Sequence, residues 1–182
     1  MPLSVAIAIA LQVLLAVTFL IIPIAAWIHG GAAQLAAERE MHRQGHPAAV
    51  LERHGIRFRE KPWELALALS ICAILTALGS LNLAASGTGR LLSWIIEPLV
   101  LVVVGFITAG QVFATQYTAA AFKRSDDDAV RNIDARAVIA AANSALPSWL
   151  RPVVLVRFPL ATLGSVLVII LLSTPAAGAY FG

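Results

Sequence analysis

Apolar side chains fall into four long runs that are separated by polar segments. The runs cover residues 3–28, 63–85, 91–122 and 153–180. About 20 apolar residues let a helix cross the hydrocarbon core of a bilayer, and each run reaches that length. The pattern predicts an all-α, polytopic membrane protein whose single domain, residues 1–182, holds four transmembrane helices. The connectors are residues 29–62 and 123–152, and the short polar segment 86–90 predicts an antiparallel hairpin of the second and third spans.

The second run carries small side chains along one helical face. They recur at spacings of four and three residues: Ala66, Ser70, Ala73, Ala77 and Ser80. In lipid no hydrophobic force drives helices together, and small residues let two backbones approach closely. This small-residue seam predicts a helix-packing surface, either within the chain or against another chain.

The third run has a broken polar stripe on one face. Its members are Glu97, Thr108, Gln111, Thr115 and Thr118. An ionisable residue inside a span is costly and is by default a functional candidate, so the stripe is a candidate pathway for an ion, a proton or a solute. Pro98 also removes a backbone hydrogen bond beside Glu97. The alternative is structural: the threonines bond to neighbouring helices, and Asn82 across the hairpin bonds to Glu97.

Both long connectors show helical patterns. Residues 31–44 are predicted to continue the first span as a helix or to lie along the membrane surface, ending before Gly45 and Pro47. In the second connector Ser125 is a natural N-cap for an amphipathic helix that lies at the interface and ends at Pro147. Neither connector is long enough to bury a hydrophobic core of its own.

Two groups of polar residues in the connectors resemble metal ligands only by type. The aspartates at 126–128 suit the first turn of the predicted helix, where acids complement the helix dipole. Glu38, His42 and His46 recur every four residues, but Gly45 interrupts the helix between them. Neither group has the spacing of a complete metal motif, so the sequence predicts no metal site and no cofactor.

Composition and charge narrow the classes further. The chain of 182 residues is 59% hydrophobic and 13% charged, far from the roughly one quarter charged that is usual in globular proteins. The net charge of +3 comes from basic residues that flank the apolar runs, which indicates membrane orientation and no nucleic-acid partner. Cys72 is the single cysteine and excludes an intramolecular disulfide.

The basic residues also predict the orientation. Eleven arginines and lysines lie in or beside the two long connectors, whereas Arg90 is the single basic residue at the opposite side. The positive-inside rule places both connectors in the cytoplasm and both termini outside. Glu64 and Arg157 are predicted near the cytoplasmic interface, where they form either an ion pair or, for Arg157, a contact with lipid phosphate.

No nucleophile motif, zinc-protease motif, phosphate loop, paired cysteine motif or internal repeat is present. The pattern favours a non-catalytic small integral membrane protein over an enzyme: an accessory or structural subunit of a larger complex, or a homo-oligomer, of the cell (inner or plasma) membrane. Its expected partners are the lipid bilayer and other membrane subunits or further copies of itself. The alternative is a small channel or carrier that uses the polar stripe, and a third hypothesis is a membrane enzyme acting on lipid through the aspartates at 126–128.

Overall fold

The computed structural model describes all 182 residues, which form helices and no β-strand. Four helical stretches are long and apolar enough to cross a membrane: Leu3–Arg43, Pro62–Leu83, Gly87–Val112 and Leu150–Leu172. The prediction of an all-helical protein with four membrane-spanning candidates is therefore confirmed.

Several spans consist of more than one helical segment. The elements are α1 (Leu3–Arg43), α2 (Ala49–Arg53), α3 (Pro62–Leu83), α4 (Gly87–Leu99), η1 (Val100–Val104), α5 (Gly105–Val112), α6 (Ala114–Lys123), α7 (Asp128–Arg131), α8 (Ala135–Ser144), α9 (Leu150–Pro159), η2 (Leu160–Gly164), α10 (Ser165–Leu172) and α11 (Pro175–Tyr180). The segments η1 and η2 are π-helical turns.

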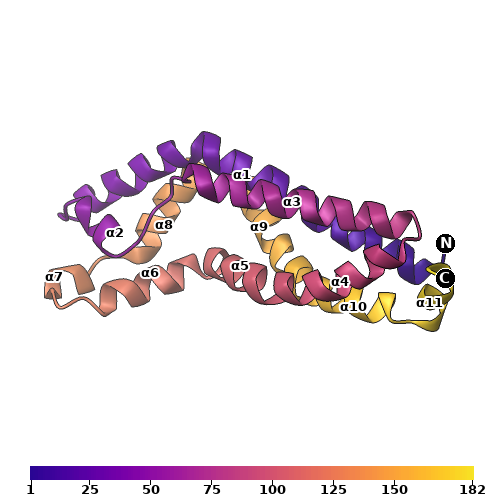
Figure 1. The fold of residues 1–182 in the computed structure, drawn as a ribbon. Helices are drawn as coiled ribbons and strands as arrows, with labels where there is room; N and C mark the ends of the chain where they lie inside the picture. The colour runs from indigo at the N-terminus through magenta and orange to yellow at the C-terminus, as the bar shows by residue number, and fades with distance from the viewer.

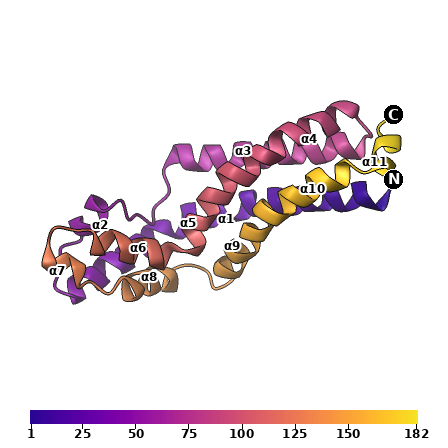
Figure 2. The same ribbon diagram turned by 90° about the horizontal axis from the view of Figure 1, so that it is seen from below.

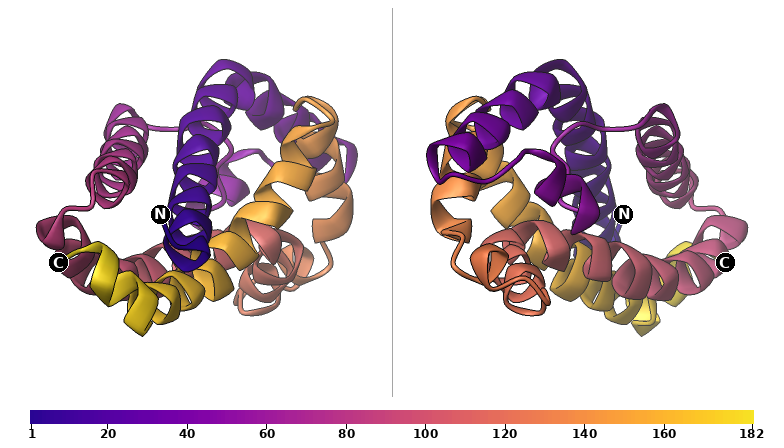
Figure 3. Two further views of the ribbon diagram at one scale, coloured as in Figure 1. Left: turned by 90° about the vertical axis from the view of Figure 1, so that its right-hand side faces the viewer. Right: turned by 90° about the vertical axis from the view of Figure 1, so that its left-hand side faces the viewer.

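The molecule is elongated, and α1 runs along most of its length (Figure 1). At one end, here called the terminal end, both chain termini lie beside α11 and the turn between α3 and α4 (Figures 1 and 2). At the other, the connector end, α2, α6, α7 and α8 gather around the second half of α1. Seen along the long axis, α1 lies between α3 on one side and α8 and α9 on the other (Figure 3), and it packs against all three and against α10.

The length of α1 separates a membrane part from an outer part. Its 41 residues extend about 60 Å at 1.5 Å per residue, twice the hydrocarbon thickness of about 30 Å. The apolar first half, residues 3–28, therefore suffices to cross the bilayer, and the remainder extends beyond it. The predicted continuation of the first span as a helix over residues 31–44 is confirmed, because α1 is unbroken to Arg43.

The hairpin of the second and third spans is tighter than its sequence indicated. Helix α4 already begins at Gly87, so the predicted connector 86–90 is mostly helical. Ala85 adopts a positive φ of 55° in the turn. A Cβ atom at Gly89 would lie 2.6 Å from the Cβ of Leu81, so glycine is required where the two helices meet.

The predicted third span, residues 91–122, is too long. The helix breaks at Phe113, where φ is −99° and ψ is 23°, and the membrane-spanning stretch ends at Val112. Helix α6 continues toward the connector end, where Phe122 is buried among the connector helices. Phe122 and Ala119 of α6 thus pack against protein in the connector-end bundle, and hydropathy alone does not distinguish this from contact with lipid.

The predicted fourth span, residues 153–180, also ends early. Helix α10 stops at Leu172, and Thr174 caps α11 by accepting a hydrogen bond from the Ala177 amide at 3.3 Å. Pro175 occupies the first turn of α11, where its missing N–H costs nothing. The hydroxyl of Tyr180 then donates to the carbonyl of Leu83 at 2.8 Å and ties the C-terminal segment to α3.

The connectors bury a hydrophobic core together, although neither is long enough to form one alone. This connector-end core consists of Ala33, Ala37, Met41, Val50, Leu51, Phe122, Val130, Ile133, Ala135, Val138 and Ala142. Its residues come from α1, α2 and α6–α8, so segments that are each too short combine around the protruding half of α1. The amphipathic helix expected over residues 125–147 is divided into α7 and α8, and its N-caps are Asp127 and Asp134 instead of Ser125. The apolar side of α8 packs against α1.

Candidate functional site

The structure divides the predicted polar stripe between two places. Glu97 is 1% exposed and lies in a polar network near the terminal end, whereas Gln111 lines a cavity toward the connector end. Thr108 is buried between them and donates to the carbonyls of its own helix. Thr115 and Thr118 lie beyond the break at Phe113, in α6.

Four buried side chains form the terminal-end network: Gln12, Asn82, Ser93 and Glu97. The amide nitrogen of Gln12 donates to Glu97 Oε1 at 3.0 Å and to Ser93 Oγ at 3.2 Å. The amide nitrogen of Asn82 donates to Gln12 Oε1 at 3.0 Å and to Ser93 Oγ at 2.9 Å. The network thus joins α1, α3 and α4 through hydrogen bonds shielded from water.

The partner of Glu97 differs from the sequence-based alternative. The structural alternative has Asn82 bonding to Glu97 directly, but Gln12 lies between them and bonds to both. Gln12 is not among the residues that the sequence pattern singled out. It is the one amide side chain in the first apolar run, so its place inside a span was the signal that could have identified it. The hydroxyl of Ser165 and the Oδ1 atom of Asn82 are buried without a hydrogen-bond partner.

Two proline-linked π-helical turns pack against each other in the middle of the third and fourth spans. Pro98 precedes η1 and Pro159 precedes η2, and the two wide turns are in contact. A proline in a helix removes a backbone hydrogen bond, and a π-turn is one way in which the following backbone adjusts. At Gly105 an added Cβ would lie 3.2 Å from Thr162 Cγ2, so the helices approach closely just past these turns.

An apolar layer separates the terminal-end network from the polar residues toward the connector end. It is formed by the buried side chains Leu15, Ala16, Phe19, Leu75, Val100, Val104 and Ala161. Along α1, Leu15 lies between Gln12 of the network and Phe19, which lines the cavity. Along the third span, Val100 and Val104 lie between Glu97 and Gln111. The two polar places are therefore distinct sites.

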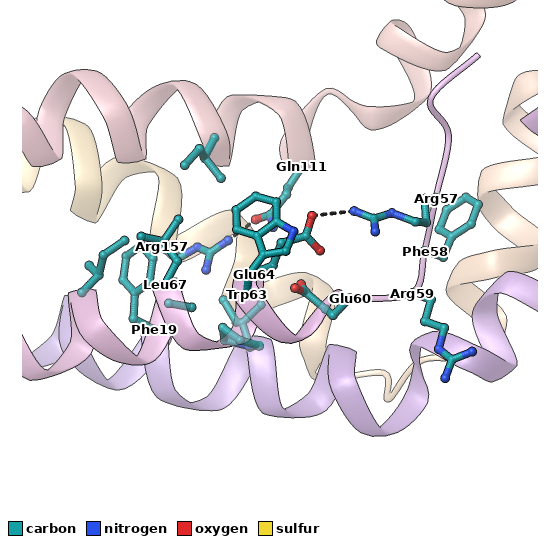
Figure 4. A pocket seen from close by; sticks show the side chains of 15 residues that line it. Phe19, Arg57, Phe58, Arg59, Glu60, Trp63, Glu64, Leu67, Gln111 and Arg157 are labelled. Carbon is teal, nitrogen blue, oxygen red and sulfur yellow. Dashed lines mark hydrogen bonds and ion pairs between the residues drawn. The ribbon is translucent and has the colours of Figure 1, made fainter. Parts of the chain in front are cut away.

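The second polar place is a cavity of about 380 Å³ (Figure 4). We call it the Arg157 cavity, and its walls come from α1, α3, α5, α9 and the segment before α3. The lining residues are Phe19, Ile22, Pro23, Arg57, Phe58, Arg59, Glu60, Trp63, Glu64, Leu67, Ala68, Ile71, Ile107, Gln111 and Arg157. Polar and apolar side chains thus share one cavity at the start of α3.

Arg157 is the most deeply buried charge of the cavity, at 2% exposure. Its Nη2 atom donates to the Oε1 atom of Gln111, and its guanidinium lies 5.0 Å from the centre of the Phe19 ring. Its Nε atom has no hydrogen-bond partner. No carboxylate oxygen lies within 4.0 Å of its nitrogens, so the guanidinium forms no ion pair within the protein.

The predicted ion pair between Glu64 and Arg157 is not formed, although both residues line the cavity. Glu64 Oε1 instead accepts from Arg57 at 2.5 Å, and its Oε2 accepts from the backbone amide of Lys61 at 2.7 Å (Figure 4). Both bonds hold Glu64 at the start of α3. Glu64 bonds to Arg57 and Lys61 because they lie within a few residues of it in the chain, so the entropy cost of bringing them together is small.

The pKa of the Glu60 carboxyl is changed by its position in this cavity. Burial raises the pKa of the Glu60 carboxyl above its usual value of 4.5, and the Glu64 carboxylate acts in the same direction. Arg57 and Arg157 oppose this effect. Figure 4 shows Glu60 and Glu64 directed into the cavity and Arg59 directed away from it.

The segment that carries these residues is fixed to α1. The backbone amide of Phe58 donates to Gln34 Oε1 at 3.0 Å. An added Cβ at Gly30 would lie 2.6 Å from the Phe58 carbonyl oxygen, so the segment crosses α1 where the absence of a side chain permits it. Arg57, Phe58 and Glu60 are therefore held at the rim of the cavity by α1.

The small-residue seam of α3 faces away from the rest of the chain. All five of its members, Ala66, Ser70, Ala73, Ala77 and Ser80, are exposed. The buried side of α3 instead carries Leu75, Leu78, Gly79 and Asn82. The hydroxyls of Ser70 and Ser80 donate to carbonyls one turn earlier in α3, at 2.9 Å each, so the face has no unsatisfied hydroxyl.

The residues considered as metal ligands are not gathered into a site. No group of three or more His, Cys, Asp or Glu side chains lies close enough to hold a metal ion. Asp127 instead caps α7 by accepting from the Ala129 amide at 2.9 Å.

Comparison with models of known protein families, with curated proteins and with solved structures gives no match.

Proposed function

We propose that this protein is a non-catalytic integral membrane protein that serves as an accessory or structural subunit, with α3 packed against a helix of another subunit or of a second copy. The observation that carries the proposal is the outward direction of the small-residue seam. Because small side chains allow close backbone approach in lipid, an exposed seam is suited to a helix from outside the chain. In addition, α3 is the least buried of the four spans.

The proposed setting is the cell (inner or plasma) membrane, with the connector end in the cytoplasm and both termini outside. The basic residues concentrated at the connector end support this orientation. The connector-end core then forms a small water-exposed bundle on the cytoplasmic side. No nucleic-acid partner is proposed.

Enlarging the seam is expected to weaken the association. Ala73→Leu combined with Ala77→Leu should lower the association constant at least about tenfold, because each overpacked position in a close helix contact costs about 1–3 kcal/mol. The measurement is size analysis of the native protein in mild detergent, together with identification of whatever co-purifies.

The matched control is Ala10→Leu, which enlarges an exposed alanine of α1 away from the seam. It is expected to leave the association unchanged. A wild-type protein that runs as a lone monomer without a partner would contradict the proposal, as would equal behaviour of the seam and control variants. If the wild-type protein runs as a multiple of its own mass and no other protein co-purifies, the partner is a second copy of this chain.

The second candidate is a small channel or carrier for an ion, a proton or a solute. The contacting π-turns η1 and η2, with Glu97 and Ser165 beside them, favour it, because interrupted helices often line transport sites. The apolar layer between Glu97 and Gln111 counts against it, because it interrupts a polar pathway along the third span. If this candidate is right, proteoliposomes should show a flux that Glu97→Gln reduces at least about tenfold, whereas Ala10→Leu should leave that flux intact.

A further inference from the structure

Arg157 lines its cavity without an ion-pair partner: Glu60 acts on it only across the cavity, from beyond 4.0 Å. An arginine that is 2% exposed normally requires an ion pair, since an isolated charge is costly in a low-dielectric environment. Gln111 and the Phe19 ring give Arg157 polar and cation–π contacts, but neither carries a negative charge. The unpartnered Nε atom leaves one donor for an additional acceptor.

The polar part of the cavity lies at the level where lipid headgroups begin. Trp63, which is 60% exposed, stands at the start of α3, as tryptophans do at the boundary of a bilayer. Arg57 is exposed beside it and lines the same cavity. Because Gln111 accepts the bond from Arg157 through Oε1, its amide nitrogen remains a donor for a ligand.

The apolar part of the cavity reaches the surface of the span. Leu67 of α3 and Ile107 of α5 line the cavity and are 45% and 42% exposed, respectively. Ile22 and Ile71 complete an apolar wall behind them. A ligand with a charged head and a hydrocarbon chain can therefore place its head beside Arg157 and its chain along this wall.

We propose that the Arg157 cavity binds the phosphate headgroup of an anionic membrane lipid from the leaflet at the connector end. The Arg157 guanidinium and the Gln111 amide donate to the phosphate oxygens, and the acyl chain lies against Leu67 and Ile107. A volume of about 380 Å³ accommodates a headgroup and the first carbons of the chains. This inference is independent of how α3 associates with other helices.

The test is lipid binding to the full-length protein in detergent, measured by native mass spectrometry. The probes are phosphatidylglycerol, phosphatidylcholine with the same acyl chains, and inorganic phosphate. Phosphatidylglycerol is expected to bind at least about tenfold more tightly than the zwitterionic lipid: both present a phosphate to the guanidinium, but the choline cation of the second cancels its net charge and is repelled by the arginines of the cavity. Arg157→Gln should remove this preference.

Arg151→Gln is the matched control, because it removes the same charge from an exposed position of the same helix. It should retain the preference. Glu60→Gln removes a carboxylate that is directed into the cavity and would repel a phosphate, and it breaks no hydrogen bond or ion pair of Arg157. It should bind phosphatidylglycerol more tightly than the wild type and provides a readout even if Arg157→Gln fails to fold.

Equal losses in Arg151→Gln and Arg157→Gln would overturn the proposal by showing a general surface attraction. So would equal binding of the two lipids, or a Glu60→Gln protein that binds phosphatidylglycerol no more tightly than the wild type. If inorganic phosphate binds in the cavity and no lipid does, the ligand is a soluble phosphate, which would also contradict the proposal.

Discussion

Phe122→Ala is expected to lower the free energy of unfolding of the connector-end bundle by about 3–5 kcal/mol, the usual cost of truncating a buried phenylalanine. Phe122 is 1% exposed and packs in the connector-end core, with the His54 ring 5.7 Å away in an edge-to-face arrangement. This core lies beyond the apolar half of α1 and is therefore stabilised by exclusion of water. The measurement is hydrogen exchange of α2, α7 and α8 in detergent or in nanodiscs.

Phe106→Ala is the control for this substitution. Phe106 lies in α5, is 80% exposed and faces outward from the third span, so its truncation leaves no cavity in the protein. Its effect is expected to be within about 0.5 kcal/mol. Equal protection of α2, α7 and α8 in the two variants would show that these helices do not depend on the connector-end core and are held by the membrane surface.

Gln12→Leu is expected to destabilise the transmembrane part by about 2 kcal/mol. The substitution leaves Glu97 Oε1 without its donor and removes the acceptor of one Asn82 bond. Each buried group that loses its partner costs about 1–3 kcal/mol, and in lipid the cost is reduced because the unfolded chain also finds partners. Reversible unfolding in mixed detergent micelles measures the change.

A second substitution separates the network from simple loss of packing. Asn82→Leu should cost less in the Gln12→Leu background than in the wild type, because the two amides share a hydrogen bond. Thr76→Val is the control: Thr76 is exposed and its hydroxyl donates to the Cys72 carbonyl of its own helix at 2.8 Å, so the effect should be small. Additive costs of Gln12→Leu and Asn82→Leu would contradict a coupled network.

The sequence located the polar residues better than it assigned their partners. Glu97 and Arg157 stand out because charges inside apolar runs are rare, and both proved to be buried at distinct sites. Of the two alternatives for Arg157, the ion pair with Glu64 is not formed, because Arg57 and the Lys61 amide already satisfy Glu64. Gln12 was overlooked even though it links Glu97 to Asn82.

The small-residue seam shows a related gap. The spacing of its small residues identified one face of α3 as a surface for close helix packing. The spacing did not show which helix packs there. The structure packs the opposite face, with Leu75 and Asn82, against the rest of the chain. The seam is therefore free for a partner, and its association remains a prediction to be tested.

By itself the sequence determined that the chain is helical and that it contains four stretches able to span a membrane, because runs of about 20 apolar residues have few other stable states in lipid. Tertiary structure alone decided where the third span ends, since hydropathy does not distinguish an apolar residue that meets lipid from one, such as Phe122, that meets another helix. It also decided that the connectors share a core and that Arg157 faces a cavity without an ion-pair partner. These features depend on contacts between residues far apart in the chain, whose formation no local pattern encodes.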